Sequence, residues 1–428
     1  MLKQIISYFL LYFLLPNSPS IPDNDNYAVI FDAGSTGSRV HVFSFDKNLD
    51  LLPVGQDYEF LLAIKPGLSS YANDPNAAAQ SLEPLLKKAE AVVPKELHAV
   101  TPLRLGATAG LRQLPGNASE AILDAVRDFF KHESSLNYRA EWVSVLQGTD
   151  EGVYEWVAIN YLLGSLGKNY SSTVGVVDLG GGSVQLAYAI SDESAANAPE
   201  VSDGVESYVT DRVVMGTKYH LYSHSYLNYG LRAARAQNLN LSRGNGNPCV
   251  TNGYQGTYQY NGVVYKVSSP ASGTSMRRCR ALTRKTLRIE APCSHRNCSF
   301  NGVWNGGGGD GFNNLYVTSF FYDTAVESGI IEANAASAKV RPIAYRDAAK
   351  RACQATIDNI RSTFPLIDGR DAPFLCMDLV YQFTLLVDGF GIDPLQEIRV
   401  LKQVDYKGSL VEAAWPLGCA VELLSSLK

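Results

Sequence analysis

The sequence predicts an α/β protein made of two related domains, and three observations support this fold class. A chain of 428 residues with 46% hydrophobic residues is too long for one compact core. Short apolar runs typical of strands alternate with amphipathic helical stretches. One unit also occurs twice, because Ala28–Phe43 (AVIFDAGSTGSRVHVF) and Val174–Ala189 (VGVVDLGGGSVQLAYA) align without a gap. We therefore expect two related α/β units with a cleft between them.

Residues 1–25 predict a cleaved signal peptide and leader. Lys3 precedes the apolar run Ile5–Leu15, and the turn-rich segment Pro16–Ser20 follows it. A run of about eleven apolar residues is short for a bilayer, which needs roughly twenty. The alternative is a buried N-terminal helix. The pattern favours a secreted protein whose mature form has no membrane span.

Each copy of the repeated unit reads as a strand, a tight turn and a second strand. An Asp ends the first strand, Asp32 in one copy and Asp178 in the other, and small residues follow it. Small residues let phosphate oxygens approach backbone N–H groups, and an Asp can hold a hydrated cation. One copy alone would read as an ordinary hairpin. Two copies with the same flanking strands predict a clamp for one polyphosphate.

Between the two copies the sequence predicts one further strand and three helices. The strand is Leu103–Ala107, and a first helix begins with Asp74 as N-cap and Pro75 at its first position. A second, amphipathic helix places Ile122, Val126, Phe129 and Phe130 on one face.

The third helix is expected from Asp150 to Leu163, with Thr149 as its N-cap. This puts Asp150 and Glu151 in the first turn, where the helix dipole favours ionised carboxylates. On that ground alone such acidic residues are usually structural.

The segment of about residues 239–311 differs in character, being rich in Asn, Gly, Tyr and Ser, and it predicts a loop-rich insertion. Its run Gly306–Gly309 is better explained as a flexible connector than as a ligand loop. The basic stretch Arg277–Arg288 could serve an anionic ligand, but a solvated helix face is the expected reading. A last turn and helix are expected around Glu412–Leu424.

Cysteines and glycosylation triplets agree with export. None of the seven cysteines precedes Cys249, and their spacing matches no zinc pattern. In an oxidising compartment six of them would form three bridges, with neighbours in sequence as the expected partners; the alternative is reduced core cysteines. Four Asn-x-Ser triplets begin at Asn117, Asn169, Asn240 and Asn297.

The net charge of −5 argues against a nucleic-acid-binding protein, which normally carries a basic excess. Backbone amides and a cation can still hold a small phosphorylated ligand. The chain has no G-x-x-x-x-G-K-[ST] motif; the nearest string, GSLGKN at Gly164–Asn169, has the wrong spacing. No G-x-G-x-x-G follows a strand and opens a helix.

Five segments resemble, in order, the conserved regions of the apyrases, the family of nucleoside triphosphate diphosphohydrolases, and most closely its soluble plant members of the legume type. These segments are Ala28–Phe43, Leu103–Arg112 (LRLGATAGLR), Val145–Gly164 (VLQGTDEGVYEWVAINYLLG), Val174–Ala189 and Ala413–Glu422 (AAWPLGCAVE). The resemblance implies hydrolysis of the terminal phosphate of nucleoside tri- and diphosphates.

The resemblance also implies a two-domain, actin-like ATPase fold of the ribonuclease H-like class, with the site in the interdomain cleft. On this basis domain I comprises residues 26–164 and 403–428. Domain II comprises residues 165–402 and carries the disulfide-containing insertion.

By the family pattern, Glu151 is the base that activates the attacking water, and Ser183 and Gln185 also contact that water. Asp32 and Asp178 hold a divalent cation, Ca²⁺ or Mg²⁺, through waters. The resemblance assigns the phosphates to Ser35, Thr36, Gly37, Ser38, Thr108, Gly180, Gly181 and Gly182.

The nucleotide base is expected to stack between Trp415 and a residue of the run Phe320–Tyr322, best aligned at Phe321, where relatives often have Tyr. The family order also implies the bridges Cys249–Cys279, Cys293–Cys298 and Cys353–Cys376, which leave Cys419 free. We expect a monomer.

Two alternatives belong to other classes. Sugar kinases and heat-shock chaperones share hairpins of this kind, although a kinase would avoid a strong water-activating carboxylate such as Glu151. A glycan- or partner-binding receptor on the same fold is the third candidate.

Overall fold

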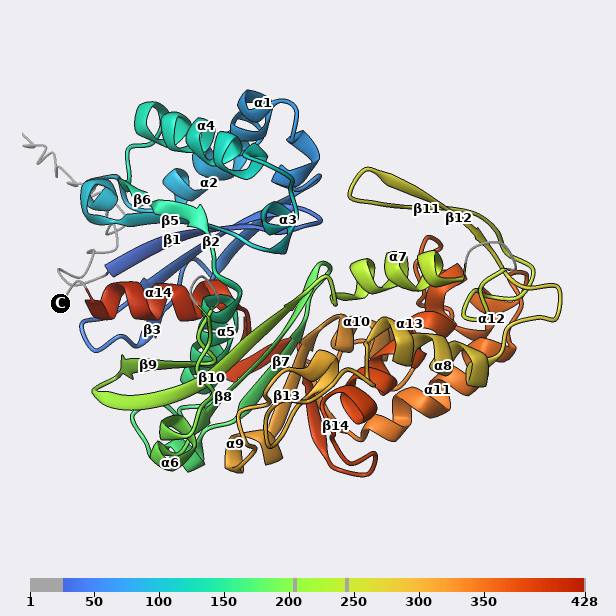
Figure 1. The fold of residues 1–428 in the computed structure, drawn as a ribbon. Helices are drawn as coiled ribbons and strands as arrows, with labels where there is room; N and C mark the ends of the chain where they lie inside the picture. Colours follow the sequence, from blue (N-terminus) through green and yellow to red (C-terminus); the bar gives the residue numbers. More distant parts are fainter. Residues whose placement is uncertain (1–25, 203–205, 243–245, 427–428) are drawn as a thin grey trace, which may run out of the picture.

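The computed structural model describes residues 26–202, 206–242 and 246–426, so the predicted leader lies outside the described residues. Two β-sheets organise the described chain (Figure 1). The first sheet has the strand order β3-β2-β1-β5-β6, with β4 also pairing with β2. The second sheet has the order β14-β15-β13-β7-β8-β10-β9. Both sheets mix parallel and antiparallel pairs, and helices pack against them, which is compatible with the expected α/β class.

The strands of the first sheet are β1 (Asn26–Ala33), β2 (Ser38–Phe45), β3 (Leu51–Leu52), β4 (Phe60–Ile64), β5 (Pro102–Ala107) and β6 (Asn137–Val145). Those of the second are β7 (Gly175–Leu179), β8 (Ser183–Ile190), β9 (Val209–Val214), β10 (Thr217–Leu227), β13 (Leu315–Ser319), β14 (Ser337–Val340) and β15 (Ile398–Leu401). Two small hairpins are β11 (Gln255–Tyr260) with β12 (Val263–Ser268), and β16 (Gln403–Tyr406) with β17 (Ser409–Glu412).

The helices before the second sheet are α1 (Pro75–Gln80), α2 (Glu83–Val92), α3 (Ala109–Arg112), α4 (Ala118–Glu133) and α5 (Gly148–Leu162). Those that follow β8 are α6 (Asp192–Ala196), α7 (Leu231–Leu241), α8 (Met276–Thr286), α9 (Asp310–Asn313), α10 (Phe320–Glu327), α11 (Pro342–Gln354), α12 (Ile360–Thr363), α13 (Leu375–Thr384) and α14 (Trp415–Ser426).

The sequence repeat is also a structural repeat. Strands β1 and β2 form an antiparallel hairpin, and β5 pairs with β1 in parallel. In the same way β7 and β8 form a hairpin, and β13 pairs with β7 in parallel. Asp32 and Asp178 are the penultimate residues of β1 and β7. The two Asp side chains therefore occupy corresponding positions in the two sheets.

The described chain is layered around these sheets. Val29 and Phe31 of β1 pack in a core with α1, α2 and α4, whereas Ala28 and Ile30 pack with α5 and α14. Helices α5 and α14 lie side by side between the two sheets (Figure 1), and Val176 of β7 belongs to the same core. The other face of the second sheet packs against α10, α11 and α13. Alternation along each strand thus gives each sheet two buried faces.

Most of the expected local signals are found in the structure. The Asp74 side chain accepts a hydrogen bond from the Ala77 N–H at the start of α1, and the predicted apolar residues of α4 are buried. Thr149 is not the N-cap of α5, however. The helix begins at Gly148, two residues before the expected start at Asp150, and Gln147 is its N-cap. The N–H groups of Gly148 and Thr149 donate instead to the carboxylate of Glu206, at 3.2 and 3.0 Å. A residue distant in sequence therefore replaces the local cap.

Three disulfides join Cys249 to Cys279, Cys293 to Cys298 and Cys353 to Cys376, and Cys419 is free and buried. The first of them closes the segment that contains the β11–β12 hairpin. Because this hairpin and α8 lie in the insertion, the insertion has more regular structure than its composition predicts. Across the described ranges, no helix combines the length and the apolar character needed to cross a bilayer. The division into domains at residues 164 and 402 stays a prediction.

Candidate active site

A cavity of about 350 Å³ lies between the two sheets, where β1, β5, β7 and β13 end. Its lining comprises Asp32, Gly34, Ser35, Thr36, Arg39, His41, Thr108, Ala109, Glu151, Glu155, Asp178, Gly180, Gly181, Gly182, Ser183, Thr318, Ser319, Phe320, Tyr322, Asp323, Leu401, Lys402, Glu412, Ala413, Ala414, Trp415 and Pro416. Seven separate stretches of the chain thus meet at one cavity.

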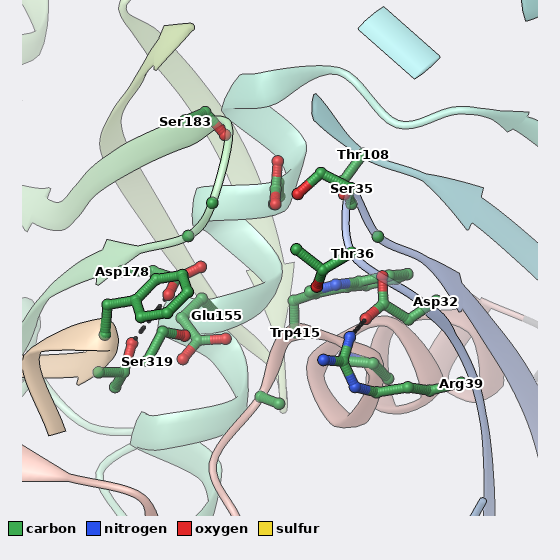
Figure 2. Close-up of a pocket in the computed structure, with 18 of the residues that line it drawn as sticks. Asp32, Ser35, Thr36, Arg39, Thr108, Glu155, Asp178, Ser183, Ser319 and Trp415 are labelled. Atoms are coloured by element: carbon green, nitrogen blue, oxygen red, sulfur yellow. Dashed lines mark hydrogen bonds and ion pairs between the residues drawn. The ribbon is translucent and has the colours of Figure 1, made fainter. Parts of the chain in front are cut away.

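The two repeated turns face each other across this cavity. A Cβ atom added at Gly181 would lie 2.8 Å from the Ser35 hydroxyl oxygen, closer than a real Cβ contact. Only a residue without a side chain allows this approach. Thr108 follows β5, and Figure 2 shows it beside Ser35 and Thr36, with Ser183 on the other side of the cavity. The structure therefore brings both small-residue turns and Thr108 to one place.

Glu151 lies in the first turn of α5, and its side chain is buried, with 7% of the residue exposed. Burial raises the pKa of this carboxyl to about 7, and the Arg112 guanidinium opposes the shift. Arg112 forms an ion pair with Glu151 and donates to the hydroxyl of Ser225 at 3.2 Å. A carboxyl poised near neutral pH can exchange a proton under physiological conditions.

Gln185 supports Glu151 without lining the cavity. Its Nε2 donates to Glu151 Oε2 at 3.2 Å, to Ser183 Oγ at 2.7 Å and to Ser225 Oγ at 2.8 Å. Its own side chain is buried on β8, so it does not reach the cavity itself. Gln185 therefore holds Ser183 and Glu151 in a fixed relation.

Asp32 and Asp178 line opposite walls of the cavity. Figure 2 shows Asp178 with Ser319 and Glu155 on one side and Asp32 with Arg39 on the other. Arg39 forms an ion pair with Asp32 at 2.9 Å, whereas Asp178 accepts a hydrogen bond from the Thr318 hydroxyl at 3.2 Å. Burial raises the pKa of Asp178 and raises that of Glu155 well above its ordinary range. The wall that carries Asp178 thus holds two buried carboxyl groups whose protonated forms are favoured.

Trp415 lines the cavity as expected, but Phe321 does not. Phe320 starts α10 and Tyr322 follows one residue after Phe321, and both of these line the cavity. Phe321 is fully buried and packs edge-on against Tyr345, with ring centroids 5.9 Å apart. Successive helical side chains point about 100° apart, so the side chain of Phe321 points in a different direction from those of its two neighbours. Phe320 and Tyr322, rather than Phe321, are therefore the aromatic residues of this run that line the cavity.

Two of the residues expected at the phosphates also lie outside the lining. Gly37 packs against the backbone carbonyl of Ile64, and Ser38 is buried as the first residue of β2. Their neighbours Ser35 and Thr36 do line the cavity. The tip of the first turn, at Ser35 and Thr36, therefore faces the cavity, whereas the residues that lead into β2 do not.

Sequence reasoning overlooked Arg112 and Glu155. Arg112 is the last residue of the segment LRLGATAGLR, and Glu155 follows Glu151 by four residues on the same helix. The i, i+4 spacing places two glutamates on one helix face, which is a signal that the sequence contains. Nothing in the sequence pairs Arg112 with Glu151, because they lie on separate elements.

The basic stretch lies on and just after α8, away from the cavity lining. Arg280 donates to both carboxylate oxygens of Asp388, at 3.0 and 2.9 Å, and Arg284 pairs with Asp388 and Glu290. Two of its arginines are therefore engaged by the protein's own carboxylates.

Comparison with known proteins shows the family of this chain. The model of the GDA1/CD39 (nucleoside phosphatase) family matches residues 19–428. The chain is 57% identical over 404 residues to an apyrase of Solanum tuberosum, covering 94% of this chain and 89% of that protein. It is 50% identical over 403 residues to a nucleoside-triphosphatase of Pisum sativum, with coverage of 94% and 89%.

A solved structure of nucleoside triphosphate hydrolases from Neospora caninum is similar in fold, with a TM-score of 0.62 and 14% identity. It covers 94% of this chain and 93% of that chain. Together with the family match, this likeness confirms the two-domain actin-like α/β fold. Because the family model and the relatives extend over nearly the whole chain, the protein belongs to the GDA1/CD39 family of nucleoside phosphatases.

Proposed function

We propose that the protein is an apyrase that removes the terminal phosphate from nucleoside triphosphates and diphosphates, using a water activated by Glu151. One observation carries this proposal: a buried carboxyl with a pKa near 7 lines the cavity on which two small-residue turns converge. Phosphoryl transfer to water needs a group that orients and deprotonates the water, and donors for the transferred oxygens. The cavity offers both.

The phosphates would be bound by the turn around Ser35 and Thr36, by the turn Gly180–Gly182, and by Thr108. Backbone N–H groups in such turns, together with hydroxyl groups, suit phosphate oxygens. Gly37 and Ser38 lie behind the first turn, so we assign them to its shape rather than to ligand contact. Donors held rigidly before the reaction stabilise the charge that develops in the transition state.

A divalent cation fits the carboxylates of this cavity. Asp32 and Asp178 face it from opposite walls (Figure 2), and in the described part of the chain no three His, Cys, Asp or Glu side chains are grouped closely enough to chelate an ion directly. This arrangement suits an ion held through its own waters, and it accepts Ca²⁺ or Mg²⁺. When bound, the cation neutralises charge on the phosphate oxygens.

In the reaction, the Glu151 carboxylate would take a proton from the attacking water. Ser183, fixed by Gln185 at 2.7 Å, would orient that water, and Arg112 would keep Glu151 in place. The nucleotide base would stack between Trp415 and Phe320, because both line the cavity and offer aromatic faces. A carboxylate placed to activate water favours hydrolysis over transfer to a second substrate.

We further propose that the protein is secreted and glycosylated. The side chains of Asn117, Asn169, Asn240 and Asn297 are all exposed, as glycan attachment requires. Three disulfides join the chain, which is typical of oxidising compartments. A loss of apparent mass after enzymatic deglycosylation of secreted protein would support this; an unchanged mass would contradict it.

The test of the activity is phosphate release from ATP and from ADP with Ca²⁺ or Mg²⁺, followed by excess chelator. We expect chelator-sensitive release from both nucleotides. Glu151→Gln should lower kcat by about a hundredfold to ten-thousandfold and leave KM nearly unchanged. Folded protein that releases no phosphate would favour a binding protein instead, and unchanged turnover in Glu151→Gln would refute the assigned base.

A further inference from the structure

We infer that two glycines behind the cavity, Gly67 and Gly230, are positioning residues that hold the two phosphate turns in shape. This inference rests on the proposed function, because it concerns the turns assigned to the phosphates. Neither glycine lines the cavity, and neither belongs to the repeated unit. Each would therefore act on the phosphates only through the turn that it supports.

The two glycines occupy equivalent places in the two halves. Gly67 precedes the 3₁₀-helix Leu68–Tyr71 with φ −71° and ψ 162°, and Gly230 precedes α7 with φ −66° and ψ 161°. A Cβ added at Gly67 would lie 2.4 Å from the carbonyl oxygen of Gly34, and one added at Gly230 would lie 2.6 Å from that of Gly180. Gly34 and Gly180 correspond in the two copies of the repeat. Because the φ values are ordinary, the close approach alone requires glycine at both positions.

The start of α7 also holds the second turn by hydrogen bonds. The N–H of Leu231 donates to the carbonyl of Gly180 at 2.9 Å, and those of Arg232 and Ala233 both donate to the carbonyl of Gly181 at 3.0 Å. None of these three residues of α7 lines the cavity, so the helix lies behind the turn. Two carbonyl groups that would repel a phosphate are thereby kept out of the cavity.

The direction of these carbonyls fixes the direction of the neighbouring donors. The C=O and N–H of a trans peptide point in opposite directions. Since the carbonyls of Gly180 and Gly181 point toward α7, the N–H groups of Gly181 and Gly182 point away from it, toward the cavity that both residues line. Within the described chain, neither of these two N–H groups donates to a protein acceptor. The turn thus offers a phosphate two donors whose direction is set in advance.

A matched pair of variants at Leu231 tests the hydrogen bond to Gly180. Leu231→Pro removes the N–H, and proline suits the first position of a helix after an extended residue. Leu231→Ala truncates the same buried side chain and keeps the N–H.

The readout isolates what the outer phosphates contribute to binding. Isothermal titration calorimetry with Ca²⁺ gives the affinities of AMP-PNP, a non-hydrolysable ATP analogue, and of AMP. We expect the ratio of these affinities to fall about tenfold in Leu231→Pro and to keep its wild-type value in Leu231→Ala. A general loss of structure would lower both affinities and leave their ratio unchanged.

The glycines themselves are tested by kinetics. Gly67→Ala and Gly230→Ala should each lower kcat/KM for ATP by about a hundredfold, because the added Cβ displaces the turn. Gly369→Ala is the control, since a Cβ there meets no atom within 4 Å, and it should keep the wild-type value. The Leu231 pair decides alone if a glycine variant does not fold.

Three results would be adverse. Equal affinity ratios in Leu231→Pro and Leu231→Ala would overturn this inference, as would wild-type kcat/KM in Gly67→Ala and Gly230→Ala. Wild-type protein that binds AMP-PNP no more tightly than AMP would instead overturn the phosphate clamp of the proposed function.

Discussion

At the scale of single residues, the site depends on which charges are compensated. Glu151 has Arg112 as a partner, and Arg112 in turn contacts Ser225 of β10. This guanidinium stabilises the ionised form of a carboxyl that burial would otherwise keep protonated. The protonation state of Glu151 therefore depends on its burial and on Arg112, a residue distant in sequence.

The pH dependence of the reaction should report this balance. Because burial raises the pKa of Glu151 to about 7, the base is protonated below that pH, and kcat/KM should rise as the pH increases through about 7. Arg112→Gln removes the opposing charge, so the acid limb should move to higher pH. Initial rates at low ATP concentration from pH 5 to 9 measure the acid limb in wild type and in Arg112→Gln. A limb that stays in place in Arg112→Gln would contradict the pairing.

The reassigned stacking residue gives a second prediction. Phe320→Ala should raise KM for ATP by about twofold to tenfold, equivalent to about 0.5–1.5 kcal/mol of lost aromatic contact. Phe321→Ala should instead lower the free energy of unfolding by about 3–5 kcal/mol, because it empties a core position. Urea denaturation and steady-state kinetics distinguish the two. Equal KM values in wild type and Phe320→Ala would exclude Phe320 as the stacking partner.

At the scale of elements, helix α5 positions much of the chemistry. It supplies Glu151 and Glu155 and lies between the two sheets beside α14 (Figure 1). Its N-terminus has no side-chain cap from Gln147, the residue that precedes it. The carboxylate of Glu206 satisfies two of its N–H groups, close to the turn that carries Glu151. The orientation of Glu151 thus depends on a loop before β9.

We predict that Glu206→Ala lowers the free energy of unfolding by about 1 kcal/mol and also lowers kcat, since the first turn of α5 loses its cap. The matched control is Asp74→Ala, which removes the cap of α1, a helix that does not line the cavity. It should cost similar stability and leave kcat unchanged. Denaturant titration and kcat for ATP give the comparison. If Glu206→Ala matched Asp74→Ala in both the free energy of unfolding and kcat, the role of the cap would be structural only.

At the scale of the whole molecule, the cavity exists because the strand ends of the two sheets are held close together. Gln113, which follows α3, connects them at one edge. Its Nε2 donates to Asn228 Oδ1 at 2.9 Å, and its Oε1 accepts from Tyr260 at 2.7 Å and from Asn261 at 2.8 Å. Tyr260 and Asn261 lie at the tip of the β11–β12 hairpin. The hairpin of the insertion therefore contacts the segment just after α3.

Gln113→Ala should favour a more open arrangement of the two sheets, because each lost hydrogen bond is worth about 1 kcal/mol net. We expect a larger radius of gyration by small-angle X-ray scattering without nucleotide, and a smaller difference from wild type with AMP-PNP. Gln237→Ala is the control, since that side chain donates a hydrogen bond to the backbone carbonyl of Asn228 on the same side of the cavity. Identical scattering curves for wild type and Gln113→Ala would argue against this connection.

The sequence by itself determined the features that depend on local pattern or on repetition. Alternating apolar residues predicted the paired strands, Asp74 predicted the start of α1, and the repeated unit predicted that Asp32 and Asp178 would occupy corresponding positions. Such signals can be read from the sequence because each depends on residues only a few positions apart, or on a segment that occurs twice.

Only the tertiary structure decided which side chains reach the cavity. Phe320 rather than Phe321 lines it, because the start of α10 fixes the helix face, and one residue of rotation moves a side chain from the cavity into the core. Glu206 replaces Thr149 as the cap of α5, and Arg112 meets Glu151, through contacts between elements far apart in the chain. Charge compensation and burial are properties of the packed molecule, so no local pattern encodes them.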